Sequence, residues 1–307
     1  MATRDATSGT TRLQRGWSLT SAPPLVLLLA AGVSVQFGAA LATTLFERTG
    51  PVGAAWVRCA FGALVLAAVV RPWRPGPARA RGAVGWAVAL GLVLAGMNTS
   101  FYAAIDRLPL GVTVAIEFLG PLGVAVAASR RPADFLWVGL AAASVAALTL
   151  PRADLGATEA AGIGFALLAA AGWAAYIVTA KGLGRTWPGN HGLALALAAA
   201  FVVTTPGGLV TSAGQIDAEV LAVAAAVGVL ATAVPYTLEL SALRRVSQGA
   251  FGVMMALEPA VAAAVGLIAL GQVLSPLDLV GVVGVGVAVW GVTGRSARAG
   301  SEAAPPL

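Results

Sequence analysis

The sequence has 307 residues, of which 58% are hydrophobic and only 10% are charged, and its mean hydropathy is +0.87. A typical soluble domain carries about 25% charged residues, so this composition excludes a water-soluble globular protein and indicates a membrane protein. The net charge of +6 does not indicate nucleic-acid binding, because the basic residues fall between apolar runs and form no polar patch. The single cysteine, Cys59, leaves no possible disulfide within the chain.

Ten apolar segments follow one another along the chain, each close to the ~20 residues that a helix needs to cross the hydrocarbon. They span residues 24–46, 52–70, 83–105, 110–128, 134–150, 158–180, 191–210, 219–239, 247–270 and 276–293. Backbone in lipid must satisfy its hydrogen bonds internally, and barrel strands would alternate polar and apolar residues. We therefore predict an all-α polytopic membrane protein with ten transmembrane helices.

Both ends of the chain are polar. Residues 1–22 lack a cleavage-site pattern, so we predict a disordered cytoplasmic tail before an uncleaved first span, and a second cytoplasmic tail over residues 294–307.

The basic residues predict the orientation, because cytoplasmic loops carry an excess of lysine and arginine. With the N-terminus inside, three basic residues face outward, namely Arg48, Arg107 and Arg152. Fifteen face the cytoplasm: Arg4, Arg12, Arg15, Arg71, Arg74, Arg79, Arg81, Arg130, Arg131, Lys181, Arg185, Arg244, Arg245, Arg295 and Arg298. This bias predicts a multi-pass protein of the cytoplasmic (inner) membrane with both termini in the cytoplasm.

An internal repeat is visible when the chain is laid on itself with a shift of 138 residues. AIDRLPLG (104–111) then faces ALRRVSQG (242–249), and Pro121 faces Pro259. A shift of 140 residues aligns AAG (30–32) with AAG (170–172). Because each repeat holds an odd number of spans, residues 23–150 and 157–293 are predicted to form two five-helix units of inverted topology, as in secondary transporters.

Four charged residues fall inside predicted spans: Arg58, Glu117, Glu239 and Glu258. A charge at mid-bilayer depth costs about 2.5 to 3.5 kcal/mol on insertion scales, so these residues are expected to face the interior of the bundle. Two interpretations of Glu117 remain open. It neutralises Arg58 in a direct ion pair between packed helices, or it faces a central cavity and binds substrate or a proton.

Glu258 is predicted near the middle of the ninth span, on a face shared with Phe251, Met254 and Met255. The methionines are equally consistent with core filler. Pro121 and Pro259 weaken their helices locally, and such breaks are tolerated where they line a cavity or are buried in protein. We predict that these two prolines are hinges or helix breaks near the midplane.

Other polar residues give weaker signals. Glu239 is expected at the inner end of its span, solvated or paired with Arg244 or Arg245. Lys181 is expected to end the sixth span, and His191 to begin the seventh at the interface. Further candidates for substrate or proton binding, for which hydrogen bonding between helices is an equal alternative, are Gln36, Asn98, Tyr102, Tyr176 and Tyr236.

Enzyme motifs are absent: the sequence contains no HExxH, no GxSxG and no Walker A motif. We therefore predict a protein that is not an enzyme, has no cofactor or metal and does not hydrolyse ATP itself.

Two blocks of sequence resemble a known family. NTSFYAAIDRLPLGVTVAIEFLGPLGVAVAASRRPADFLWVGLAA (98–142) and PYTLELSALRRVSQGAFGVMMALEPAVAAAVGLIAL (235–270) are similar to the signatures of bacterial threonine and homoserine exporters, within the ten-span EamA group of the drug/metabolite transporter superfamily. The matching positions include Glu117, Pro121, Glu258 and Pro259. One departure is Gln272, where the superfamily often has a glutamate.

The resemblance implies two inverted five-helix halves and export of small amino acids or related metabolites, driven by protons, from a monomer or homodimer in the lipid bilayer. Two alternatives stay open. The chain could export drugs or other metabolites on the same scaffold, or it could be a membrane assembly component that transports nothing.

Overall fold

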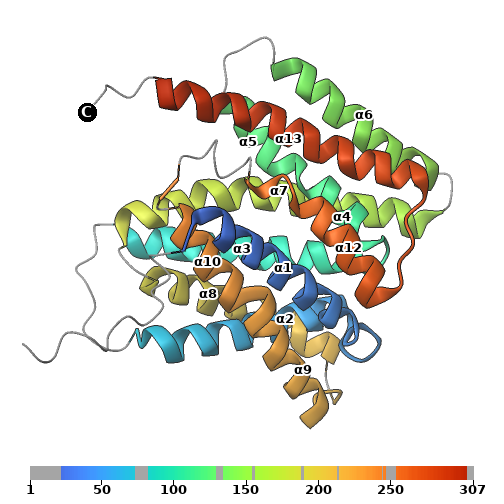
Figure 1. Cartoon of the computed structure of the whole chain (residues 1–307). Coiled ribbons are helices and arrows are strands. Elements are labelled where there is room, and N and C mark those ends of the chain that lie inside the picture. Colours follow the sequence, from blue (N-terminus) through green and yellow to red (C-terminus); the bar gives the residue numbers. More distant parts are fainter. Residues whose placement is uncertain are drawn as a thin grey trace, which may run out of the picture.

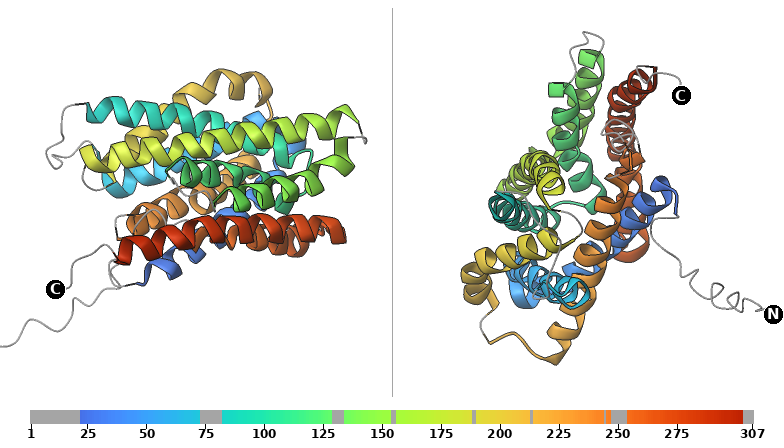
Figure 2. Two further views of the ribbon diagram at one scale, coloured as in Figure 1. Left: turned by 90° about the horizontal axis from the view of Figure 1, so that it is seen from above. Right: turned by 90° about the vertical axis from the view of Figure 1, so that its left-hand side faces the viewer.

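The computed structural model describes residues 22–72, 82–128, 134–153, 156–187, 190–212, 214–243, 245–246 and 254–302. Every regular element in these ranges is a helix, and most helices run side by side in one bundle (Figures 1 and 2). The predictions for residues 1–21 and 303–307 lie outside the described residues. So do those for Arg74, Arg79, Arg81, Arg130, Arg131, Arg244 and Phe251. The all-helical fold class is confirmed.

The helices of the first half follow the predicted segments closely. They are α1 (Pro24–Thr43), α2 (Phe46–Val70), α3 (Ala83–Ile105), α4 (Leu110–Glu117), α5 (Leu119–Ala128) and α6 (Asp134–Ala153). The second half contains α7 (Ala157–Thr186), α8 (His191–Ser212), α9 (Ala218–Gly228), the π-helical segment η1 (Val229–Ala233), α10 (Val234–Leu243), α12 (Glu258–Leu270) and α13 (Pro276–Glu302).

Six helical stretches in the described part of the chain are long and apolar enough to cross a membrane, by length and composition. These are Pro24–Thr43, Phe46–Val70, Ala83–Ile105, Ala157–Thr186, His191–Ser212 and Ala218–Leu243. Shorter apolar helices cover Leu110–Val124, Phe135–Leu148, Glu258–Leu270 and Pro276–Gly291. Large apolar side chains also face outward, for example Phe135 and Leu136, which are 70% and 75% exposed. Such a surface is stable in lipid and costly in water.

Two predicted spans are interrupted, and both interruptions precede a proline. The segment predicted over 110–128 is divided at Phe118, and in the segment predicted over 247–270 a turn at residues 256–257 precedes α12. A proline lacks the N–H that would bond to the carbonyl four residues earlier and also crowds that carbonyl. Pro121 therefore weakens the helix at Glu117, and Pro259 at Met255.

These interruptions change the predicted place of both glutamates. Glu117 ends α4, and Glu258 begins α12 instead of lying in the middle of a continuous helix. A turn at residues 256–257 separates Met254 and Met255 from α12, so the predicted common face of these methionines with Glu258 stays a prediction.

Several helix ends differ from the predicted boundaries. α7 continues to Thr186, so Lys181 lies inside it, and α13 continues to Glu302, beyond the predicted start of the tail at residue 294. α2 begins at Phe46, but Gly50 has φ +64° and Pro51 follows it, which produces a kink near its start. His191 begins α8, as predicted.

Glycines allow the long helices to approach closely. A Cβ atom at Gly172 of α7 would lie 2.8 Å from the Cβ of Met97 in α3, and one at Gly208 of α8 would lie 2.3 Å from the Trp56 ring in α2. α6 and α13 pack against each other at one edge of the bundle (Figures 1 and 2), where Gly284 meets the Ser144 side chain. Small residues at helix contacts are typical of membrane bundles, since tight packing replaces the hydrophobic driving force.

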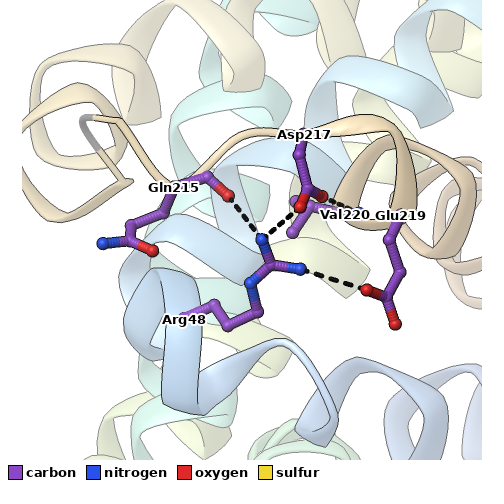
Figure 3. A network of polar contacts seen from close by, with 5 residues as sticks. All are labelled: Arg48, Gln215, Asp217, Glu219 and Val220. Atoms are coloured by element: carbon purple, nitrogen blue, oxygen red, sulfur yellow. Dashed lines mark hydrogen bonds and ion pairs between the residues drawn. The ribbon is translucent and has the colours of Figure 1, made fainter.

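A polar cluster joins the start of α2 to the chain before and within α9 (Figure 3). Arg48 donates hydrogen bonds to Asp217 and, over 3.4 Å, to Oε2 of Glu219, and its Nη2 lies 3.5 Å from the Gln215 carbonyl oxygen. Asp217 also caps α9 by accepting from the Val220 N–H over 2.9 Å. The hydrogen bond from Arg48 holds the pKa of the Asp217 carboxyl below its ordinary value.

Candidate functional site

A cavity of about 60 Å³ lies between helices of both halves of the chain. It is lined by Val35 and Gln36 of α1, Arg58 of α2, Met97, Asn98 and Phe101 of α3, Glu117 of α4, Trp173 and Tyr176 of α7, Tyr236 and Glu239 of α10, and Glu258 of α12. Seven helices therefore contribute polar, charged and apolar side chains to one small cavity inside the bundle.

Arg58 is the positive charge of this cavity and is only 2% exposed. Its Nε donates to Oγ1 of Thr232 over 3.0 Å, and its Nη2 donates to the Ala231 carbonyl oxygen over 2.6 Å. Both partners belong to η1, and π-helical turns of this kind are frequent at functional sites. The guanidinium also lies over the Tyr102 ring, 5.2 Å from its centroid, in a cation–π arrangement.

The fold brings η1 close enough to hold Arg58. A Cβ atom at Gly38 of α1 would lie 2.7 Å from the Ala231 backbone nitrogen, and one at Gly62 of α2 would lie 2.5 Å from the Thr232 methyl group. The Ser34 hydroxyl also donates to the Leu230 carbonyl oxygen over 2.7 Å. Two glycines and two side-chain donors thus fix the π-helical segment against α1 and α2.

Three carboxyl groups share the cavity with this one guanidinium. Glu117, Glu239 and Glu258 are 7%, 6% and 6% exposed. Oε2 of Glu239 accepts a hydrogen bond from the Tyr176 hydroxyl over 3.2 Å. The Glu258 carboxyl lies against α1, where a Cβ atom at Gly32 would approach its Oε1 to 3.0 Å.

Arg58 and Glu117 line the same cavity but form no direct ion pair within 4.0 Å. Between described residues, the ion pairs join Arg48 to Asp217 and Glu219, and Arg107 to Asp106. The interpretation in which Glu117 simply neutralises Arg58 by direct contact is therefore not supported. The alternative, in which Glu117 faces a cavity, is the arrangement that the structure shows.

Polar atoms without a protein partner remain at the cavity wall. They are Oε1 of Gln36, Nδ2 of Asn98 and Oε1 of Glu258, whereas Oδ1 of Asn98 accepts from the Tyr236 hydroxyl over 3.3 Å. A buried polar atom with no partner costs about 1 to 3 kcal/mol. Such atoms favour occupation of the cavity by water or a polar ligand.

Seven of the residues predicted as binding residues meet at this cavity: Gln36, Arg58, Asn98, Glu117, Tyr176, Tyr236 and Glu258. Tyr102 does not line it, because its ring lies beside the Arg58 guanidinium and tilts against Phe46. Pro121 and Pro259 do not line it either, and act on the local course of the helices. Thr113, which lies one turn before Glu117 in α4, donates its hydroxyl to the Pro109 carbonyl oxygen and does not line the cavity.

Sequence reasoning missed five lining residues: Val35, Met97, Phe101, Trp173 and Glu239. The prediction for Glu239 was wrong, since this carboxyl is buried and bonded to Tyr176, away from solvent. One signal was available. Tyr236 and Glu239 are three residues apart and share a helical face, so a candidate tyrosine there also predicted the glutamate.

No group of three or more His, Cys, Asp or Glu side chains in the described part of the chain is arranged to hold a metal ion. The acidic residues of the cavity come from three helices and face one arginine. This arrangement suits a small ligand that carries both a carboxylate and an ammonium group.

Comparisons with known proteins support this interpretation. Residues 160–294 match the EamA-like transporter family. The chain is 40% identical over 260 residues to the threonine/homoserine exporter RhtA of Escherichia coli K12, covering 83% of this chain and 86% of that protein. It is 38% identical over 274 residues to the RhtA protein of Salmonella typhimurium LT2, covering 88% and 91% respectively.

A solved crystal structure shares the fold. It superposes with a TM-score of 0.60 at 17% sequence identity, covering 90% of this chain and 99% of the solved chain. At this identity the likeness concerns the fold alone.

Proposed function

Because this chain belongs to the EamA-like transporter family, we propose that it exports small amino acids of the threonine and homoserine type across the cytoplasmic membrane, in exchange for protons. The observation that carries the proposal is the buried cavity lined by Arg58 and three carboxyl groups, in a chain that is 40% identical to threonine/homoserine exporters.

The cavity chemistry fits a zwitterion. Arg58 uses Nε and Nη2 for η1, and Nη1 remains to bind an α-carboxylate. The carboxyl groups of Glu117, Glu239 and Glu258 suit an α-ammonium group. The partnerless atoms of Gln36 and Asn98 offer one acceptor and one donor, which match a side-chain hydroxyl.

Proton exchange follows from the charges in this space. Three ionised carboxylates and one guanidinium would leave a net charge of −2 in a small buried cavity. In a medium of low dielectric such a charge must be compensated by a cation or by protonation. We infer that the negative charge is balanced in turn by the ammonium group of the substrate and by protons. Glu117 and Glu258 are the carboxyl groups that bind and release these protons.

The helix contacts support two inverted five-helix repeats, over residues 23–150 and 157–293. α3 packs along α7. Under the proposed repeat, α3 corresponds to α10 and α7 corresponds to α1, and α10 and α1 also pack together. Asn98 and Tyr236 are 138 residues apart, which is the repeat shift, and they are hydrogen-bonded to each other. Contact between equivalent residues is expected where a pseudo-two-fold axis passes between them.

Other lining residues form equivalent pairs as well. Phe101 and Glu239 correspond under the shift of 138, and Gln36 and Tyr176 under the shift of 140. The interruption at Phe118 corresponds to the one that begins at Ala256. With α4 and α5 as one span, and η1 joining α9 to α10, the chain then crosses the membrane ten times with both termini in the cytoplasm. Alternating access by inverted repeats places the binding site near the midplane, where this cavity would lie.

Transport into everted membrane vesicles tests the proposal. Vesicles that contain the full chain are given labelled threonine, homoserine and a panel of other amino acids, with and without an imposed proton gradient. We expect gradient-dependent uptake of one or a few amino acids. Glu117→Gln is expected to abolish it at an unchanged protein level, because a neutral amide neither exchanges a proton nor pairs with ammonium.

Glu159→Gln is the matched control, because Glu159 lies at the start of α7 outside the cavity. Uptake of no amino acid by vesicles with folded protein would overturn the amino-acid proposal. Gradient-driven uptake of lipophilic cations would then favour drug export on the same scaffold. Uptake that is equal with and without the gradient would overturn antiport alone.

A further inference from the structure

The central cavity has an apolar wall beside its charged groups. The residues of this wall are Val35 of α1, Met97 and Phe101 of α3, and Trp173 of α7. Val35 directly precedes Gln36 in the chain, and Met97 directly precedes Asn98. The two residues that offer an acceptor and a donor to a substrate hydroxyl therefore each have an apolar lining residue next to them. This wall is the part of the cavity suited to the carbon chain of an amino acid.

The cavity is small for an amino acid. One water molecule needs about 10 to 15 Å³ of cavity volume, so about 60 Å³ accepts only about four to six groups of that size. Threonine and homoserine each contain more non-hydrogen atoms than this, so even these substrates must displace part of the wall. The largest substrate that fits therefore depends on which wall residue can move.

Trp173 is a fixed part of the wall. Its ring meets the Phe118 ring edge to face, with the two centroids 4.6 Å apart, and Phe118 is fully buried. An indole ring can move only as one rigid body, and a close-packed interior leaves no space for such a movement.

Met97 is the adaptable part of the wall. A Cβ atom at Gly172 of α7 would lie 2.8 Å from the Cβ of Met97 and 3.2 Å from its Cγ, so the stem of this side chain is held against the α7 backbone. Methionine is unbranched and has three rotatable bonds, which lets it fill irregular gaps. The thioether end of Met97 can therefore change its position while the stem stays in place.

We propose that Met97 sets the maximum length of the exported amino acid, at the four-carbon chain of threonine and homoserine. This inference rests on the proposed function, and it assigns the selectivity of that cavity to one side chain. The thioether end moves aside for a chain of this length and blocks a longer one. One methylene in a hydrophobic pocket changes discrimination by about 10- to 200-fold, so a single additional carbon is enough for rejection.

Competition for labelled threonine uptake into everted vesicles tests the proposal. The unlabelled competitors are 2-aminobutyrate, norvaline and norleucine, which have unbranched chains of four, five and six carbons. In wild type, we expect the inhibition constant to rise about tenfold or more from 2-aminobutyrate to norvaline. Met97→Ala removes the thioether end, so in this variant norvaline should inhibit about as well as 2-aminobutyrate.

Leu94→Ala is the matched control, because Leu94 is a fully buried residue of α3, in the same hydrophobic cluster as Met97, that does not line the cavity. It should keep the wild-type limit. An equal shift in Leu94→Ala, an unchanged limit in Met97→Ala, or equal inhibition by all three competitors in wild type would overturn the proposal.

Two further outcomes are distinguishable. Should Met97→Ala not fold, Met97→Val shortens the same side chain with a smaller loss of volume and should shift the limit in the same direction, while the wild-type series still tests the limit itself. Absence of threonine uptake by wild-type vesicles would overturn the proposed function and this inference with it. Threonine uptake with an unchanged chain-length limit in the variant would overturn this inference alone.

Discussion

The Tyr236 hydroxyl donates a hydrogen bond over 3.3 Å to Oδ1 of Asn98, a residue 138 positions away in the chain. One side chain comes from α3 and the other from α10, and both line the central cavity. The two halves of the chain therefore meet at the wall of this cavity.

This contact predicts energetic coupling between the two halves. Tyr236→Phe and Asn98→Ala each remove it, so the double variant should be about 0.5 to 1.5 kcal/mol less destabilised than the sum of the single variants. Thermal or denaturant unfolding in detergent measures the cycle. The control pair is Tyr236→Phe with Thr205→Val, because Thr205 takes part in a separate hydrogen bond, which it accepts from Trp56. The effects of these two substitutions on stability should be additive. Additivity in both pairs would contradict the contact.

The hydrogen bond from Tyr176 to Glu239 predicts a shared effect on transport. Tyr176→Phe leaves the Glu239 carboxyl without this donor, and a hydrogen bond to a charged group contributes about 1.5 to 3 kcal/mol. We expect each of Tyr176→Phe and Glu239→Gln to raise the KM for the exported amino acid about tenfold or more, and the double variant to be little worse. Initial rates in everted vesicles check this. Independent, multiplying effects would show that the two residues act separately.

The close approach of α1 to η1 predicts a steric requirement at Gly38. Gly38→Ala would place a methyl group 2.7 Å from the Ala231 backbone nitrogen, and overpacking of this kind costs about 1 to 3 kcal/mol. Since η1 holds Arg58, transport should fall together with Tm. Gly96→Ala in α3 is the control, because a Cβ atom there meets nothing within 4 Å. Equal Tm values for the two variants would contradict this packing.

Gln272, which departs from the glutamate common in the superfamily, has a structural role. Its Oε1 accepts from the N–H of Leu110 at the start of α4 over 2.9 Å. Gln272→Ala should cost about 1 to 3 kcal/mol, because the first N–H groups of a helix have no partner within it. Gln272→Glu keeps an acceptor near the positive end of the helix and should retain stability. Unfolding measurements on both variants test this role. A loss of stability in Gln272→Ala but not in Gln272→Glu supports a helix cap, whereas unchanged stability in both would indicate a residue needed only for transport.

The cluster around Arg48 predicts a defined pH dependence. The folded-state pKa of Asp217 is lowered by the Arg48 hydrogen bond, so its contribution to stability is present above the ordinary aspartate pKa of about 3.9 and is lost as pH falls through the folded value. The Tm difference between wild type and Asp217→Asn should be constant from pH 8 to about pH 5 and shrink below about pH 4. High salt should also reduce it, because the pair is exposed. A difference that grows on acidification would contradict this assignment.

The membrane environment, the all-helical fold class and most of the cavity residues could be predicted from the amino-acid sequence. Apolar length and scarcity of charge exclude a soluble protein, since water cannot stabilise so much apolar helix surface. A buried charge is costly in lipid, so Arg58, Glu117 and Glu258 could be singled out without coordinates. α3 and α8 also begin at predicted residues, because the change from polar to apolar sequence is abrupt there.

How these residues contact one another depends on helix packing, which local sequence does not reveal. Composition could not show that Glu239 faces the cavity or that Tyr102 lies outside it, because the rotation of each helix depends on its neighbours. Local sequence also could not show that Arg58 bonds to η1 while Glu117 stays apart from it. Arg58 bonds to η1 because Gly38 and Gly62 leave room for this π-helical segment to pack closely against α1 and α2. These contacts join residues more than 150 positions apart in the chain.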